Sequence, residues 1–221
     1  MPPTALRPTL PRMKTTRLAG VHLWSEFQAD RGIDFNGFLI ATDAGNVLVD
    51  PMGASADAVA FAKARGGAAW IVVTNADHWR ASDDWQRATG ASIAAPEPDR
   101  ERLGARAANV DHWFGPDQAL PDGLGQAFEV RWLHGGKSPA EAALYLVPQR
   151  ALLFGDLVRS HESGRLRMLP DDKLSDPARA RSDVRTLRDL NLEAILLGDG
   201  DSLFTGARSA WLDFLRELGS A

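Results

Sequence analysis

The sequence predicts an α+β fold in which two β-sheets pack face to face between outer layers of helices, a four-layer αββα sandwich. Two observations lead to this prediction: the order strands, helix, strand, helix occurs twice along the chain, and no Pro/Ser-rich linker separates the two halves. The last segment also places Trp211, Phe214, Leu215 and Leu218 at the spacing of a core-facing helix. We therefore expect one domain over residues 20–221, preceded by a flexible basic tail over residues 1–19.

The first half of the chain contains short segments rich in β-branched and aromatic residues, separated by turns that contain Gly and Asp. Ser55 is a suitable N-cap for a helix that Gly66 and Gly67 end. We predict strands at 21–27, 35–42, 46–50, 70–73 and 92–95, and helices at 55–65, 81–89 and 97–108.

The second half repeats this order. Asp176 followed by Pro177 is a typical helix start, with Asp as the N-cap and Pro at the first helical position. The segment 158–175 is polar, and we expect a solvated loop there that includes Arg159. We predict strands at 126–133, 142–147, 151–154 and 194–197, and helices at 176–190 and from 207 onward.

The composition excludes several classes of function. Of the 221 residues 44% are hydrophobic and 24% are charged, as in ordinary soluble proteins. The chain has no cysteine, which excludes disulfides, thiolate zinc sites, iron–sulfur clusters and a cysteine nucleophile. The formal net charge of −4 gives no basic field for nucleic acid or an anionic membrane, and we expect neither as a partner. The basic tail lacks the apolar core of a signal peptide, so we expect a cytoplasmic protein.

Four polar segments each follow a predicted apolar strand. They are Asp50-Pro51, 74–80, 136–141 together with Gly155-Asp156, and 198–201. Polar groups at strand ends of such proteins often converge on a site, although Asp, Asn and Gly are also ordinary turn formers. Four such segments in this order favour a common site.

These segments resemble the motifs of the metallo-β-lactamase superfamily over about residues 20–215. The stretch Val47-Leu48-Val49-Asp50 resembles its second strand, which ends in aspartate, and Ile71-Val72-Val73-Thr74 resembles the strand that leads into its T-H-x-H-x-D-H signature. The other matching stretches are Gly136-Lys137-Ser138-Pro139 for G-H-T-P, Leu153-Phe154-Gly155-Asp156 for the strand with the metal-bridging aspartate, and Gly198-Asp199-Gly200 for G-H-G. The resemblance implies a hydrolase fold whose cleft binds two zinc ions.

Most metal-ligand positions of that family carry other residue types here. By position, the resemblance places Asn75 and Asp77 at the first two histidines, Trp79 and Arg80 at the Asp-His pair, Lys137 at the third histidine, Asp156 at the bridging aspartate and Asp199 at the last histidine. Only Asp156 keeps the expected type. A zinc pair needs imidazole nitrogens and a bridging carboxylate. We therefore expect no zinc pair and no other cofactor.

The replacements form a set of opposite charges. Two cations, Arg80 and Lys137, would face three carboxylates, Asp77, Asp156 and Asp199, and such a cluster can persist in a protein when its members pair. We predict that the Lys137 ammonium lies within about 4 Å of at least two of these carboxylates. Residues expected to bind a ligand or line the site are Asp50, Asn75, His78, Trp79, Arg80, Ser138 and Asp201. The network could equally be structural and only hold the two halves together.

The sequence leaves three functions open, and with them whether the chain is an enzyme. Asp77, Lys137, Asp156 and Asp199 are the catalytic candidates if it is a hydrolase. In the first, the cleft that binds zinc in the family binds a small molecule here, and zinc-dependent hydrolysis is lost. In the second, one Mg²⁺, Mn²⁺ or Ca²⁺ ion held by Asp77, Asp156 and Asp199 supports hydrolysis. In the third, the chain is a non-catalytic interaction protein. A homo-oligomer is compatible with all three.

Overall fold

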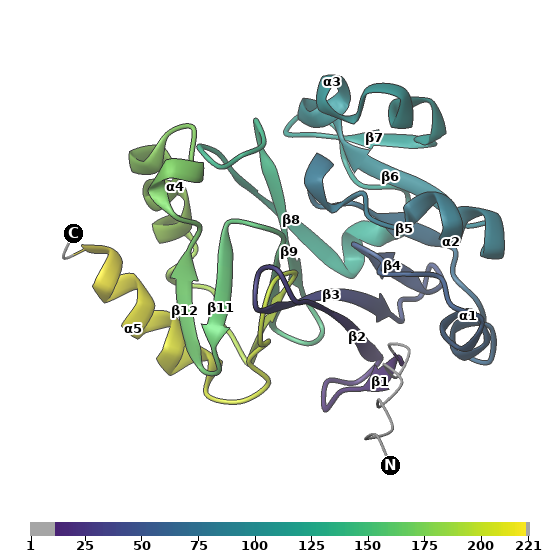
Figure 1. Cartoon of the computed structure of the whole chain (residues 1–221), viewed down its shortest axis with the longest axis horizontal. Coiled ribbons are helices and arrows are strands. Elements are labelled where there is room, and N and C mark those ends of the chain that lie inside the picture. The colour runs from purple at the N-terminus through teal and green to yellow at the C-terminus, as the bar shows by residue number, and fades with distance from the viewer. Residues whose placement is uncertain (1–11, 220–221) are drawn as a thin grey trace, which may run out of the picture.

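A computed structural model describes residues 12–219 and contains two β-sheets that pack face to face, with helices on both outer sides (Figure 1). The first sheet has seven strands in the order β1-β2-β3-β4-β5-β6-β7. Its strands are β1 (Lys14–Thr15), β2 (Val21–Gln28), β3 (Ile33–Ile40), β4 (Val47–Val49), β5 (Trp70–Val72), β6 (Ser92–Pro96) and β7 (His112–Phe114). The strands are antiparallel from β1 to β4 and parallel from β4 to β7.

The second sheet has four strands in the order β13-β10-β9-β8. These are β8 (Phe128–Leu133), β9 (Glu141–Leu146), β10 (Ala151–Phe154) and β13 (Ala194–Leu197). The pair β10 and β13 is parallel, and the other pairs are antiparallel. A separate two-stranded ribbon joins β11 (Val158–Glu162) to β12 (Arg165–Met168).

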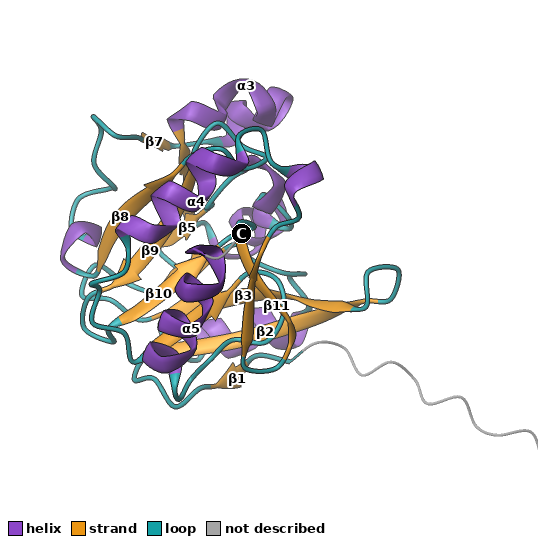
Figure 2. Ribbon diagram, turned by 90° about the vertical axis from the view of Figure 1, so that its left-hand side faces the viewer, coloured by secondary structure: helices purple, strands orange, loops and turns teal. Residues whose placement is uncertain are grey.

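The helices cover the outer faces of the sheets (Figures 1 and 2). Over the first sheet lie α1 (Ala56–Lys63), α2 (Ser82–Thr89) and α3 (Arg100–Leu103), and over the second lie α4 (Pro177–Thr186) and α5 (Ala207–Gly219). Ser55 caps α1, as predicted, and Asp176 caps α4 by accepting the Arg179 N–H. Both caps satisfy N–H groups that have no partner within the helix.

Three hydrophobic layers hold these four layers together. The middle layer consists mainly of strand residues, such as Val47 and Val49 of the first sheet and Leu144 and Leu153 of the second. Alternate residues point the other way: Leu48 packs with α1, while Phe154 packs with Trp211 of α5. This alternation, which is the period of a β-strand, confirms the predicted αββα fold.

Some predicted elements need correction. The polar segment 158–175 is not all loop, because it forms β11 and β12, whose side facing α5 is apolar through Leu166. The helix predicted at 97–108 is a short α3 between two 3-10 turns. The tail expected over 1–19 does not include residues 13–15, because β1 pairs with β2 and Met13 is buried. Residues 1–11 of the expected tail lie outside the part of the chain that the structure describes.

No helix between residues 12 and 219 is both long and apolar enough to cross a membrane.

Candidate functional site

A cleft of about 340 Å³ opens where β4, β5, β10 and β13 end. It lies at the edge where the two sheets meet, next to the β2–β3 hairpin. Its lining is almost entirely charged, with one aromatic ring: the residues are Arg31, Phe35, Asp77, His78, Arg80, Lys137, Asp156 and Asp199.

His78 is at the centre of the site and is held by Asp50. The segment after β5 turns through a 3-10 helix, Ala76–His78, and this turn brings His78 back against the end of β4. The His78 Nδ1 atom lies 2.7 Å from Asp50 Oδ2 and therefore donates its proton to that carboxylate. The Thr74 N–H and hydroxyl donate to the same carboxylate at 2.8 and 2.7 Å. Asp50 itself has a left-handed backbone, with a φ of 47°.

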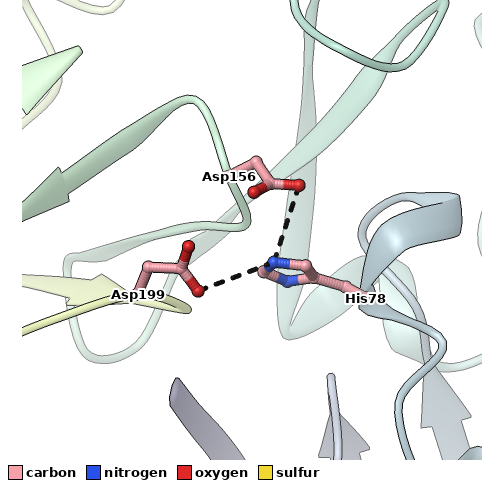
Figure 3. A group of neighbouring side chains, drawn as sticks. All are labelled: His78, Asp156 and Asp199. Carbon is pink, nitrogen blue, oxygen red and sulfur yellow. Dashed lines mark ion pairs between the residues drawn. The ribbon is translucent and has the colours of Figure 1, made fainter. Parts of the chain in front are cut away.

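The other ring nitrogen of His78 faces two carboxylates. Nε2 lies 3.7 Å from Asp156 Oδ2 and 3.9 Å from Asp199 Oδ1 (Figure 3). The ring fits there because residue 198 is glycine: a Cβ at Gly198 would lie 2.6 Å from His78 Cε1. Burial and the Arg80 guanidinium lower the pKa of His78, but Asp50 and Asp156 outweigh them, so its pKa is raised above the usual value.

Arg80 lies directly beside His78. Its backbone is also left-handed (φ 45°), and its side chain is only 8% exposed. Nη1 donates to the carbonyl groups of Asn36 and Asp50, and Nη2 donates to the Gly198 carbonyl at 3.0 Å and to Asp199 Oδ1 at 3.3 Å. The same Nη2 is 3.3 Å from His78 Nε2. The guanidinium therefore occupies the space in front of that nitrogen.

Two more cations bind the buried carboxylates. Lys137 Nζ lies 2.8 Å from Asp156 Oδ1, and Arg159 Nη2 bridges Asp156 Oδ1 at 3.3 Å and Asp199 Oδ2 at 2.8 Å. Burial raises the pKa of Asp156, but the charges of His78, Lys137 and Arg159 lower it by more. The pKa of Asp156 is therefore below its usual value. Asp156 Oδ2 is buried and accepts no hydrogen bond from the described residues.

Glu141 supports the loop that carries Asp156. This fully buried carboxyl accepts the backbone N–H groups of Gly155, Asp156 and Leu157 at 3.1, 2.9 and 3.0 Å. Burial, with the nearby charge of Asp156, raises the pKa of Glu141 to about 7. The carboxyl therefore positions Asp156 through the backbone and titrates near neutral pH.

The outer rim of the cleft is more exposed. Lys137 Nζ is 3.8 Å from Asp77 Oδ2, so Lys137 lies within the expected distance of two of the three carboxylates. Arg102 donates to Asp77 Oδ1 at 3.1 Å and to the Lys137 carbonyl at 2.7 Å. Asp77 and Arg102 are each 40% exposed, so this pair is in contact with solvent.

The structure brings most of the expected site residues together, but five of them do not line the cleft. Asp50 is fully buried behind His78, whose Nδ1 it binds. Trp79 is fully buried in the core under α2, with its Nε1 bonded to Asp83. The Ser138 hydroxyl donates to buried Asp99. Asn75 accepts the Asp77 N–H and so caps the 3-10 turn. Asp201 is exposed beyond the end of β13. The expectation that these five side chains line the site was therefore wrong.

Sequence reasoning missed several residues of the site. Arg159 was expected in a solvated loop, yet β11 directs it inward. Glu141 was named only as the end of the polar segment 136–141, and Arg31, Phe35 and Arg102 were not predicted at all. For Glu141 a signal existed, because it is the one charged residue of the otherwise apolar strand Glu141–Leu146. The strand that carries Arg159, Val158–Glu162, is mostly polar and gave no such signal.

One group among the described residues has the geometry of a possible metal site. His78, Asp156 and Asp199 each offer one ligand atom, and these three atoms lie within 4.8 Å of one another. The group includes His78, where the sequence suggested Asp77.

The comparisons with known proteins agree with one another on the fold. The family model described as "Metallo-beta-lactamase superfamily" matches residues 13–219. The DIM-1 metallo-beta-lactamase aligns with a TM-score of 0.73 and 16% identity, covering 95% of this chain and 97% of its own. The metallo-beta-lactamase from Pontibacter korlensis aligns with a TM-score of 0.73 and 18% identity, covering 96% of this chain and 100% of its own. The metallo-beta-lactamase IND-7 aligns with a TM-score of 0.71 and 17% identity, covering 93% of this chain and 98% of its own. No curated protein matches the sequence.

Proposed function

Because the chain belongs to the metallo-beta-lactamase superfamily, we propose that it binds a small molecule in the cleft where that family carries its zinc pair, without zinc-dependent hydrolysis. The observation that carries this proposal is the position of Arg80. Its guanidinium lies 3.3 Å from both His78 Nε2 and Asp199 Oδ1, the two atoms that a metal ion at this place would need.

The donor atoms of the cleft do not fit a zinc pair. Zinc binds histidine nitrogen and carboxylate oxygen at about 2.0–2.2 Å and favours imidazole ligands in such sites. The cleft offers a single imidazole nitrogen, and three of the four oxygens of Asp156 and Asp199 contact cationic side chains. Two zinc ions in this cleft would lie close to three positively charged side chains, Arg80, Lys137 and Arg159. The charge repulsion supports a site in which side-chain cations take the place of metal.

A second candidate function rests on the fourth of these carboxylate oxygens, Asp156 Oδ2. Asp156 Oδ2 has no hydrogen-bond partner among the described residues, and it belongs to the compact group with His78 and Asp199. A hydrolase that uses one Mg²⁺, Mn²⁺ or Ca²⁺ ion would place the ion there, because such ions prefer oxygen ligands. The guanidinium of Arg80 beside His78 opposes this candidate.

Elemental analysis of untagged protein, purified without a metal-affinity step, tests the proposal. We expect zinc, manganese and magnesium far below one ion per chain. One equivalent of zinc would contradict the proposal, and one equivalent of magnesium or manganese would favour the second candidate.

Charge-removal variants make the same test quantitative. The Arg80→Met and Lys137→Met variants should bind Zn²⁺ or Mn²⁺ more tightly than the native protein in isothermal titration calorimetry, because each removes a positive charge that contacts a carboxylate of the possible metal site. The matched control is Arg102→Met, which removes a rim cation that contacts neither Asp156 nor Asp199 and should leave metal affinity unchanged. Weaker metal binding by Arg80→Met would show that Arg80 supports a metal site.

A further inference from the structure

We infer that the ligand of this cleft is a small organic anion, with its charged group held by Arg31 and Lys137 and its apolar part against Phe35. This inference rests on the proposed function and names the chemical class of the ligand.

The first step is the balance of charge around the cleft. Its lining holds three cations, Arg31, Arg80 and Lys137, and three carboxylates, Asp77, Asp156 and Asp199. Behind the lining, Arg159 pairs with Asp156 and Asp199, and Asp50 pairs with His78. The whole chain, by contrast, has a net charge of −4. The lining is therefore balanced in charge, and the preference for an anion follows from which of its charges a ligand can reach.

The second step is which charges a ligand can reach. Asp156 and Asp199 are 5% and 2% exposed, and each contacts two cations. The accessible carboxylate is Asp77, and Lys137 and Arg102 already pair with it. An incoming amine therefore finds carboxylates that are neutralised.

The third step is that two cations keep unused donors. The Arg31 side chain is 59% exposed, and within residues 12–219 its one ion pair is a 3.9 Å contact with Asp30. Exposed pairs of this kind are weak. Lys137 has three N–H donors, of which the hydrogen bond to Asp156 uses one, while Asp77 lies 3.8 Å away as an ion pair. Its side chain is 26% exposed. Both side chains can donate to a carboxylate or phosphate of the ligand.

Phe35 supplies the apolar surface. Its ring is flanked by the guanidinium groups of Arg31 and Arg80, each 5.3 Å from the ring centre, and it is the one apolar side chain in the lining. The volume of about 340 Å³ is at the lower end of the range for ligand pockets. Both features favour a compact ligand that joins one anionic group to a short apolar body.

A matched set of probes tests the charge preference. Benzoate, phenyl phosphate, benzyl alcohol and benzylamine share one ring and differ in charge, and amide chemical-shift changes in ¹⁵N-labelled protein report both affinity and location. We expect benzoate or phenyl phosphate to shift the signals around residues 31–35 and 137, and the comparison of these two distinguishes carboxylate from phosphate. Benzylamine should bind more weakly than either anion.

Variants locate the anion. Arg31→Gln should weaken binding of the anionic probe by about tenfold, the effect of one lost charge-assisted hydrogen bond. The control Arg87→Gln removes an arginine that pairs with Asp84 on α2, outside the cleft, and should leave affinity unchanged. Equal affinity of Arg31→Gln and native protein would overturn the inference, as would tighter binding of benzylamine or benzyl alcohol, or no binding of either anion. If neutral or cationic fragments bind the cleft and anions do not, the anion inference fails but the proposed small-molecule binding stands. If no fragment of a broad library binds the cleft, the proposed function itself fails.

Discussion

Arg159 is the side chain that joins the two buried carboxylates of the site. One terminal nitrogen contacts Asp156 and Asp199, and the side chain is only 12% exposed. Without Arg159, Asp199 keeps Arg80 and Asp156 keeps Lys137, and both keep His78 when it is protonated.

We predict that Arg159→Met destabilises the protein by about 3 kcal/mol, because it strands buried negative charge. Urea unfolding followed by tryptophan fluorescence measures this loss. The exposed Arg87→Met should cost less than about 0.5 kcal/mol, as expected for a surface ion pair. Equal costs for the two variants would mean that water already screens the pair at Arg159.

Glu141 gives the stability a dependence on pH. Its folded pKa of about 7 is raised above the unfolded value, so the folded state holds a proton that the unfolded state releases. This contribution is complete below about pH 4.5 and is lost as the pH rises through about 7, and it amounts to roughly 3 kcal/mol at most. The raised pKa of His78 acts in the same direction, and the lowered pKa of Asp156 acts only in more acidic solution.

We predict that the stability of the native protein falls more steeply from about pH 5 to about pH 8 than that of Glu141→Gln. The glutamine stays neutral and its oxygen can still accept the N–H groups of Asp156 and Leu157, so the variant can fold. Urea unfolding at several pH values measures both slopes. Parallel slopes would show that Glu141 does not titrate in this range.

Glycines with a left-handed backbone set how closely elements can approach one another. Gly135 (φ 76°) follows β8 and lies against the start of α4, where a Cβ would come 2.3 Å from the Asp176 carbonyl oxygen and 2.9 Å from the Ala180 nitrogen. Gly164 (φ 82°), in the turn between β11 and β12, has a similar backbone but no atom within 4 Å of such a Cβ.

These two glycines form a matched pair of variants. Gly164→Ala should cost about 1 kcal/mol, the effect of the backbone conformation alone. Gly135→Ala should cost at least about 3 kcal/mol, because the N-terminus of α4 must move away from β8. The difference in thermal unfolding between the two variants measures this contact. Similar losses would mean that α4 shifts at little cost.

At the level of elements, periodicity and capping residues predicted most of the fold. Trp211, Phe214 and Leu215 are buried as their spacing required, and the caps of α1 and α4 are the predicted ones. The ribbon β11–β12 escaped prediction because only one of its faces is apolar. Trp79 was misplaced for a related reason: its position among polar residues suggested the cleft, but the 3-10 turn rotates it into the core. Sequence motifs locate strand ends, whereas the direction of each side chain depends on the turn that follows.

At the level of the whole molecule, the middle hydrophobic layer combines strands from both halves of the chain. Val49 and Val72 come from the first half, and Leu144 and Leu196 come from the second. Asn36 adds a polar connection beside the site, since its side-chain amide donates to the carbonyls of Leu197 and Gly200. Neither half can bury its inner face alone.

We therefore predict a single cooperative unfolding transition. Tryptophan fluorescence, which reports on Trp85 in the first half and Trp211 in the second, should change together with far-UV circular dichroism during urea unfolding. A fragment of residues 1–120 should lack the sharp transition of the full chain. Two separate transitions, or a fragment that folds alone, would contradict a shared core.

The cations that contact Asp156 and Asp199 are covalent parts of the polypeptide. Arg80, Lys137 and Arg159 reach the site as soon as the chain folds, in a fixed ratio of one each. Unlike bound ions, they cannot dissociate on dilution, exchange for a competing ion or be removed by a chelator. A protein built in this way keeps the charge of its cleft in a metal-starved cell, and a change in that charge requires a mutation in the gene.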